Sequence, residues 1–338
     1  MVASDAQRAV LYYTAPLTQP RVKHGEHVGF EDASLRDTLV DNRVACQVSM
    51  ENARKHSFAL SPHGFELRKW PTSVANFADS AAVLQQYVPE METLVADAMR
   101  ANGFSGVHAV VLWDICLRDS TLTNELQTAT AKPGCELDLL APVSLVHADF
   151  YDADSLTRRL RERWTTSTDT LSSYMRADFE SKGLSRCDME RWCGNAATRG
   201  RVLSVNVWRS IDIEQPVRRC PLAVCDPASL NVAEEQVPFV IRCPDVELTE
   251  AHFLSPERGR GAEGAESAAV EGSQHRWYSF PEMVHDECLL FLSGDTEGSV
   301  TAVPHTSFED PRTQPHDPPR RSIEARVFVL FSPESERE

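Results

Sequence analysis

Apolar and polar residues alternate with two different periods along this chain. From residue 81 to residue 102, apolar side chains recur every three or four positions, which predicts an amphipathic helix that stops at Gly103. Pro89 lies inside this pattern and predicts a kink or a division of the helix. Residues 107–116 form a nearly unbroken apolar run rich in β-branched side chains, which favours a buried strand. Helix and strand signals therefore both occur in the first third of the chain.

The rest of the chain shows mostly short strand patterns with turn signals between them. Residues 152–164 and 180–196 have helical character, and residues 202–208 alternate so that side chains two apart share a face. Further strands are predicted at residues 9–14, 44–50, 237–242, 288–292, 299–303 and 323–331. Short strands of this kind predict a mixed α+β fold whose core is a double-stranded β-helix, or jelly roll, with flanking helices.

The domain organisation is predicted from where these patterns stop and resume. Strand patterns continue on both sides of the small, charged and glycine-rich segment 255–275, which predicts a flexible loop and not a linker between domains. The helical segment 151–200 interrupts the strands and predicts an insertion or a lid over a pocket. We therefore expect residues 1–338 to form a single domain.

Composition narrows the classes of partner. The formal net charge is −16 at pH 7, which disfavours binding to nucleic acid or to anionic membrane surfaces. Nine cysteines are an odd number and include no Cys-x-x-Cys pair, so buried reduced thiols are expected instead of a disulfide framework or a zinc site. The first residues lack a signal-peptide pattern, and no apolar run approaches transmembrane length. These features predict a cytoplasmic protein that acts on a small molecule.

Three residues have the types and the order of a mononuclear iron site. His147 and Asp149 lie two positions apart, so their side chains point the same way if residues 144–150 are extended. His305, from a distant strand, would complete a facial triad of two imidazoles and one carboxylate. Such a triad leaves three adjacent positions open, which can take a bidentate keto acid and dioxygen. The pattern predicts that these three residues bind Fe(II) and form the catalytic centre.

Arg320 and Ser322 are candidates to anchor the keto acid. They lie two apart at the start of the apolar run 323–331, so both side chains face the same side of the predicted strand. An arginine fork suits the distal carboxylate of 2-oxoglutarate better than lysine does, and a hydroxyl adds a hydrogen bond. His-x-Asp or Arg-x-Ser alone is a weak indication, because short motifs recur by chance. The prediction rests on the order of the motifs along the chain: His-x-Asp precedes His305, and Arg-x-Ser follows it.

Four further residues are candidates for the pocket, each with a structural alternative. Asn206 and Trp208 would face inward if residues 202–208 line the barrel. The amide could then bind the keto acid and the indole could wall the substrate, or both could be satisfied core residues. Arg118 could meet an anionic group of the substrate or form a surface ion pair, and His63 could line the pocket or belong to a turn.

Seven blocks of sequence, spread along nearly the whole chain, match the pattern of a known family. They are residues 61–65, 146–149, 206–209, 221–226, 283–291, 305–311 and 319–326. In these blocks the chain resembles the fungal hydroxylase/desaturase family related to gibberellin desaturase and to the small subunit of the cephamycin 7-alpha-methoxylase. Two positions depart from the family pattern: Arg321 stands where an acidic residue is usual, and Ser210 stands where a proline is usual. Neither departure touches a proposed ligand.

The resemblance implies an Fe(II)- and 2-oxoglutarate-dependent oxygenase that uses dioxygen to hydroxylate, desaturate or cyclise a small secondary-metabolite precursor. Two alternatives stay open. The first is a non-catalytic partner subunit of an oxygenase pair, and the second is a cupin-like metal protein that uses no keto acid. A homodimer, or a heterodimer with a homologue, is a further expectation.

Overall fold

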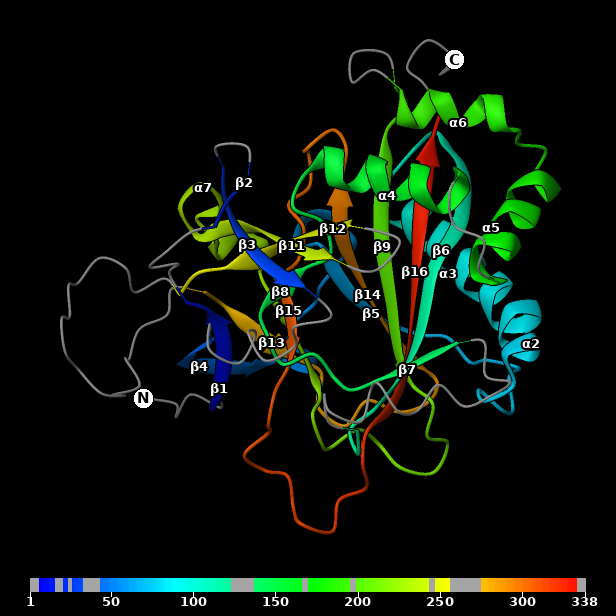
Figure 1. The fold of residues 1–338 in the computed structure, drawn as a ribbon. Helices are drawn as coiled ribbons and strands as arrows, with labels where there is room; N and C mark the ends of the chain where they lie inside the picture. Colours follow the sequence, from blue (N-terminus) through cyan, green and yellow to red (C-terminus); the bar gives the residue numbers. More distant parts are fainter. Residues whose placement is uncertain are drawn as a thin grey trace.

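Two facing sheets form the core of the protein (Figure 1). Helices cover the outer side of one of them. The predicted flexible loop at 255–275 lies almost wholly outside the part of the chain that the structure describes. The computed structural model describes residues 6–15, 21–23, 26–32, 43–122, 137–165, 170–194, 199–242, 247–255 and 275–332.

The larger sheet contains most of the short strands. Its neighbours pair antiparallel except β4 with β13 and β11 with β3. The strands predicted at 9–14, 44–50 and 237–242 are confirmed as members of this sheet. Among the described residues its order is β1 (Gln7–Thr14), β4 (Arg43–Asn52), β13 (Trp277–Ser279), β10 (Leu222–Cys225), β15 (His305–Ser307), β8 (His147–Ala148), β12 (Glu247–Phe253), β11 (Gln236–Arg242), β3 (Glu26–Asp32) and β2 (Arg21–Lys23).

The smaller sheet contains the long strands that stand side by side in Figure 1. The strands predicted at 107–116, 202–208 and 323–331 are confirmed and lie next to one another in its middle. Over the described residues its order is β5 (Phe65–Lys69), β14 (Glu287–Asp295), β9 (Val202–Ser210), β16 (Arg321–Phe331), β6 (Val107–Asp119) and β7 (Asp138–Leu140).

The two faces of β16 are chemically different. Ile323, Ala325 and Val327 belong to the apolar core between the smaller sheet and helix α3. Glu324 and Arg326 alternate with them and point toward the larger sheet, although both are buried. Burying a charged side chain is unfavourable unless it is paired. The part of the space between the sheets that faces Glu324 and Arg326 is therefore polar and needs a specific arrangement of charges.

The helix predicted at 81–102 runs from residue 80 to residue 101 but changes its hydrogen-bond pattern on the way. It comprises α2 (Ser80–Ala82), the π-helical segment η4 (Val83–Tyr87) and α3 (Val88–Ala101). Pro89 lies in the first turn of α3, because proline lacks the N–H that an uninterrupted helix would use there. The predicted division at Pro89 is confirmed. Gly103 has a left-handed φ of 78° just beyond the end of the helix.

Three helices follow His147 and Asp149 in the chain: α4 (Ala153–Thr165), α5 (Thr170–Ser181) and α6 (Arg186–Cys193). They share an apolar cluster with Trp113 and Phe328 of the smaller sheet. The prediction of one helix over 180–196 was wrong. Gly183, with φ 75°, ends the preceding turn, and a capping box of Ser185 with Asp188 starts α6.

Two strand predictions near the proposed ligands were also wrong. The strand expected over 144–150 is only the two residues of β8. Residues 299–303 form no strand, because the carboxylate of Asp295 accepts hydrogen bonds from backbone N–H groups at 297, 299 and 300 and folds this segment into a turn. Short elements complete the described chain: η3 (Ala53–Lys55), α1 (Leu60–His63), η5 (Pro227–Ser229) and α7 (Val232–Glu235).

Two findings bear on the composition of the chain. Of the seven cysteines that the structure describes, all free thiols, five are buried as predicted, whereas Cys187 is exposed and Cys220 is half-buried. Within the described ranges, no helix is both long and apolar enough to cross a membrane.

Candidate metal centre and pocket

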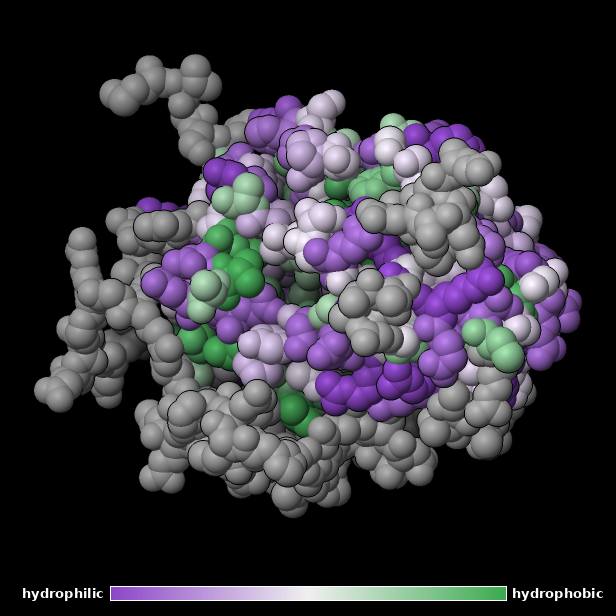
Figure 2. All heavy atoms as spheres, turned by 90° about the horizontal axis from the view of Figure 1, so that it is seen from above, coloured by the Kyte–Doolittle hydropathy of each residue, from purple (hydrophilic) through white to green (hydrophobic). Residues whose placement is uncertain are grey.

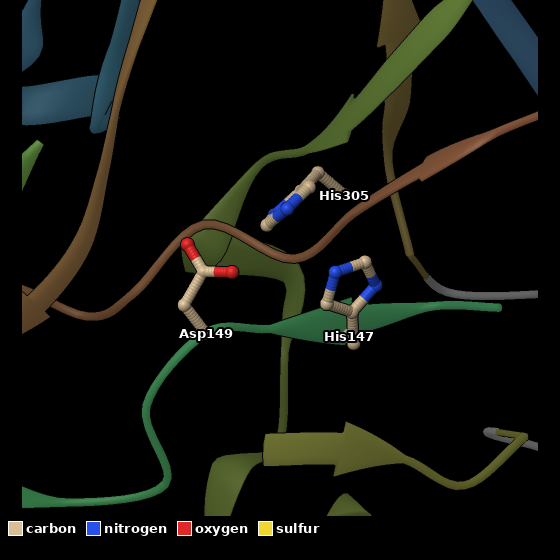
Figure 3. A group of neighbouring side chains, drawn as sticks. All are labelled: His147, Asp149 and His305. Atoms are coloured by element: carbon tan, nitrogen blue, oxygen red, sulfur yellow. The ribbon is translucent and has the colours of Figure 1, made fainter. Parts of the chain in front are cut away.

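Two neighbouring strands of the larger sheet bring the predicted ligands together. β8 pairs antiparallel with β15, and His147 lies directly opposite His305 in that ladder. Their ring centroids are 4.4 Å apart. One ligand atom from each histidine and one from Asp149 all lie within 4.8 Å of one another. Figure 3 shows the two imidazoles and the carboxylate converging, so a single ion between them would contact all three.

Backbone carbonyls fix which nitrogen of each imidazole faces the ion. Nδ1 of His147 lies 2.8 Å from the carbonyl oxygen of Leu145, and Nδ1 of His305 lies 3.1 Å from that of Val303. A carbonyl oxygen can only accept, so each Nδ1 carries the proton and each Nε2 keeps a free lone pair. Burial and the adjacent His305 lower the pKa of His147 to about 4, so its imidazole is neutral at pH 7. Metal-binding histidines in proteins have this same arrangement.

One oxygen of the Asp149 carboxylate is already held by its neighbours. Its Oδ2 accepts a hydrogen bond of 2.7 Å from Nδ2 of Asn206 and lies 3.4 Å from Nε of Arg326. Burial raises the pKa of Asp149, but the charge of Arg326 and that of His305 outweigh burial and keep the pKa below its ordinary value. The carboxylate is therefore ionised, and its Oδ1 is left for an ion.

A network of buried charges supports this carboxylate from the smaller sheet. Arg326 of β16 donates to the carboxylates of Asp114, at 2.6 Å, and of Glu324, at 2.9 Å. Arg118 of β6 lies 3.4 Å from Glu324 and donates to the carbonyl oxygen of Ala141. Burial raises the pKa of Glu324, yet Arg326 and Arg118 together lower it below its ordinary value. These charges are mutually paired, so the network forms a well-ordered support behind the metal ligand.

Three buried polar groups near the start of β16 lack partners among the described residues. They are Nε of Arg320, Oγ of Ser322 and Nε1 of Trp208. The guanidinium carbon of Arg320 lies 5.6 Å from the centre of the Trp208 ring, and its Nη1 donates to the carbonyl oxygen of Cys220 at 2.6 Å. Burial and the neighbouring Arg118 lower the pKa of Arg320 to about 10. A buried cation among unsatisfied donors is a binding site for an anion.

These residues fit the metal and the co-substrate that the sequence predicts. Two imidazoles whose Nδ1 atoms face backbone carbonyls, together with one ionised carboxylate, are a suitable donor set for Fe(II). Each buried donor without a partner costs about 1–3 kcal/mol, and a carboxylate placed at Arg320 and Ser322 would remove that cost. The arrangement can therefore hold a divalent metal and, separately, an organic anion such as 2-oxoglutarate.

A cavity of about 210 Å³ lies beside Asp149. Trp113 and Phe150 give it apolar walls, and Arg118 and Arg326 line it as well. Figure 2 shows a hollow on the face seen from above, with hydrophilic and hydrophobic residues along its rim. The cavity is the place where a small molecule can approach the carboxylate ligand.

Asn206 faces inward as predicted, but its contacts differ from the predicted ones. Its Nδ2 donates to Oδ2 of Asp149 and, at 3.1 Å, to Oε1 of Glu324. Its Oδ1 accepts a hydrogen bond from Ser293. The amide group thus has no free donor for the keto acid. Its contacts make Asn206 a residue that orients Asp149.

The Asn206→Ala variant is expected to bind Fe(II) about 10- to 100-fold more weakly than the wild type, because Asp149 loses the donor that orients it. Anaerobic titration with Fe(II) would measure the affinity. Ser204→Ala is the matched control, since Ser204 lies two residues away on the same face of β9 and bonds to Trp113 and Ser293. Equal affinity in both variants would remove this role from Asn206.

Trp208 and Arg118, the other two predicted substrate contacts on strands of the smaller sheet, lie in different surroundings. Trp208 lies against Arg320 and in an apolar cluster, and the tryptophan that walls the cavity is Trp113. A substrate-wall role for Trp208 stays a prediction, and the structure adds Trp113 as a wall of this cavity. Arg118 does line the cavity, but its charge is shared with Glu324.

His63 has the contacts of a turn residue. Its Nδ1 accepts a hydrogen bond of 3.2 Å from the backbone N–H of Ala59, and its ring packs edge-on against Phe58. It is absent from the lining of the cavity beside Asp149. The turn alternative fits these contacts better than a pocket role does.

Comparisons with known proteins agree with this geometry. A family model described as "Oxidoreductase/YMDC permease-like domain" matches residues 11–179 and 185–330. The hydroxylase/desaturase CTB9 of Cercospora beticola is 28% identical over 296 residues, which cover 84% of this chain and 76% of that protein. The alpha-ketoglutarate-dependent dioxygenase phiK of a fungal species is 26% identical over 295 residues, covering 84% of this chain and 83% of that protein.

A solved structure shares the fold. A variant of the iron and alpha-ketoglutarate-dependent endoperoxidase NvfI aligns with a TM-score of 0.64 and 19% identity, covering 99% of this chain and 100% of that chain. The prediction of a jelly roll with flanking helices is thereby confirmed. The resemblance to fungal hydroxylase/desaturases is confirmed by the sequence relatives.

Proposed function

Since the chain belongs to the oxidoreductase/YMDC permease-like domain family, we propose that it is an Fe(II)- and 2-oxoglutarate-dependent oxygenase that oxidises an unactivated C–H bond of a small organic molecule. Two observations carry the proposal: ligand atoms of His147, Asp149 and His305 lie within 4.8 Å of one another, and the buried Arg320 has no ion pair among the described residues. The hydroxylase/desaturase and dioxygenase relatives support the same class of reaction.

Fe(II), bound together with 2-oxoglutarate and dioxygen, supplies the oxidising chemistry, and the keto acid leaves as succinate and carbon dioxide. His147, Asp149 and His305 hold the metal from one side and leave its other positions open. Arg320 pairs with the distal carboxylate of the keto acid, and Ser322 donates a further hydrogen bond to it. The protein residues are thus assigned binding and orientation, and no acid–base step is asked of them.

The remaining task of the protein is to place the substrate. The cavity beside Asp149 has Trp113 and Phe150 as apolar walls, which can position a substrate next to the carboxylate ligand. Hydroxylation, desaturation and ring closure differ in which hydrogen of the substrate lies closest to the metal. The proposal therefore covers all three outcomes for a small secondary-metabolite precursor.

The test is formation of succinate from 2-oxoglutarate by the purified protein with Fe(II), ascorbate and air. Succinate is expected above the level of an EDTA-treated sample, and mass spectrometry should show oxidised product with a suitable substrate panel. Iron bound without succinate would favour a cupin-like protein that uses no keto acid. Failure to bind iron, together with a stable complex with a homologue, would favour a non-catalytic partner subunit. Sedimentation of the purified chain would test the predicted homodimer.

A further inference from the structure

Helix α4 brings two arginines to the cavity beside Asp149 that the proposed chemistry does not use. Arg158 and Arg159 both line this cavity. The guanidinium carbon of Arg159 lies 5.6 Å from the centre of the Trp113 ring, which belongs to the same lining. The Arg159 side chain is only 14% exposed, so its charge is largely removed from water.

The other cations of this region already have partners. Arg326 is bonded to Asp114 and Glu324, and it also lies next to Asp149. Arg163, one turn further along α4, donates to Asp114 at 3.0 Å. These arginines balance the acidic groups that stand behind the metal ligands. They have little capacity left for a ligand in the cavity.

Arg159 is different. Among the described residues it makes no hydrogen bond, and the nearest carboxylate, that of Glu162, lies at 4.0 Å, the outer limit of an ion pair. Burial and the like charge of Arg163 lower the pKa of Arg159. Glu250 of β12 also lines the cavity, but among the described residues no hydrogen bond or ion pair joins it to Arg159. A mostly buried guanidinium that faces a cavity without a bonded anion is a ready partner for one.

We propose that Arg159, on the wall formed with Trp113, binds a carboxylate group of the substrate, so that the oxygenase acts on a small organic acid. This inference rests on the proposed function and specifies its substrate class. A guanidinium fork donates two parallel hydrogen bonds to a planar carboxylate, and Trp113 and Phe150 of the same lining can contact the apolar body of such a molecule. Arg158 adds a second positive charge at the cavity.

The same carboxylate chemistry could come from 2-oxoglutarate, but the structure provides a separate place for that anion. Arg320, with the unsatisfied hydroxyl of Ser322, lies at the start of β16 and does not line the cavity beside Asp149. The anion site for the co-substrate and the one for the substrate therefore use different arginines. The experiment has to tell the two anions apart.

The probe is benzoate, a planar aromatic carboxylate, and benzamide is its neutral counterpart. Calorimetric titration of the metal-free protein should show benzoate binding at least about tenfold more tightly than benzamide. Arg159→Gln should remove most of this preference, and Arg159→Lys should restore part of it because the charge returns. Arg161→Gln is the matched control, since Arg161 lies on the same helix and donates to the backbone carbonyl of Cys193. The control should bind benzoate as the wild type does.

A second arm measures 2-oxoglutarate affinity with Mn(II) in place of Fe(II). This affinity should be unchanged in Arg159→Gln. Equal weakening of benzoate and 2-oxoglutarate would assign Arg159 to the co-substrate and overturn the proposal. Equal binding of benzoate and benzamide, or an equal loss in Arg161→Gln, would also overturn it. If the protein prefers benzoate but forms no succinate, the anion site is supported and the proposed oxygenase activity is refuted. If it forms succinate but does not prefer benzoate, the oxygenase activity is supported and the anion site is refuted.

Discussion

Alanine in place of His147 or His305 is expected to lower succinate formation by about three orders of magnitude or more, together with loss of bound iron. Each variant removes one of three ligand atoms, and among the described residues no other group of histidine, cysteine and acidic side chains is placed to hold a metal. The folding cost should be limited, because each change leaves one backbone carbonyl without its donor, about 1–3 kcal/mol. Iron content and succinate yield would be measured on the same samples.

His252→Ala is the control that separates loss of a ligand from loss of a buried histidine. His252 lies opposite His147 on β12, is equally buried, and bonds to Thr14 instead of pointing at the cluster. This variant should keep its iron and its succinate formation. Full activity in His147→Ala would refute the triad. Asp149→Ala should also be inactive but is a less clean test, because it deprives Arg326 of a carboxylate.

The triad could be predicted from the sequence because its geometry depends on local rules. Side chains two apart on an extended segment share a face, and even the two residues of β8 are enough to orient His147. Arg320 and Ser322 follow the same rule on the long strand β16. The long strands β6 and β16 were also predictable from the apolar runs that they contain, and β9 from its alternating pattern.

The partners of the buried charges could not be predicted in the same way. Asp114 in an apolar run signals that a cation must lie nearby, but only the pairing of β6 with β16 shows that this cation is Arg326. The alternation in β9 predicts that Asn206 faces inward, but it does not predict that Asp149 and Glu324 lie within hydrogen-bond distance of the amide. Arg159 carries no sequence signal at all, since helix α4 contains several arginines and only packing decides which one faces the cavity.

Arg326 of β16 and Arg320, which directly precedes that strand, should respond to substitution in opposite ways. Arg326 is held by Asp114 and Glu324 and lies next to Asp149, so Arg326→Met would leave buried carboxylates unpaired and lower the free energy of unfolding by about 3–5 kcal/mol. Arg320 has no such partner, and burial lowers its pKa to about 10. A cation whose pKa falls on folding is destabilising while it is charged, that is, at neutral pH.

Arg320→Met is therefore expected to leave the thermal stability of the ligand-free protein unchanged or slightly higher, while raising the 2-oxoglutarate concentration for half-maximal succinate formation by about 100-fold. Wild-type protein should gain thermal stability when 2-oxoglutarate is added with Mn(II), and the variant should lose that gain. Melting curves with and without the keto acid, beside succinate rates over a range of its concentration, would measure both effects. An unchanged requirement for 2-oxoglutarate would show that the anchor lies elsewhere. Arg326 would then be the next residue to test, through charge-preserving Arg326→Lys, because its removal alone is expected to impair folding.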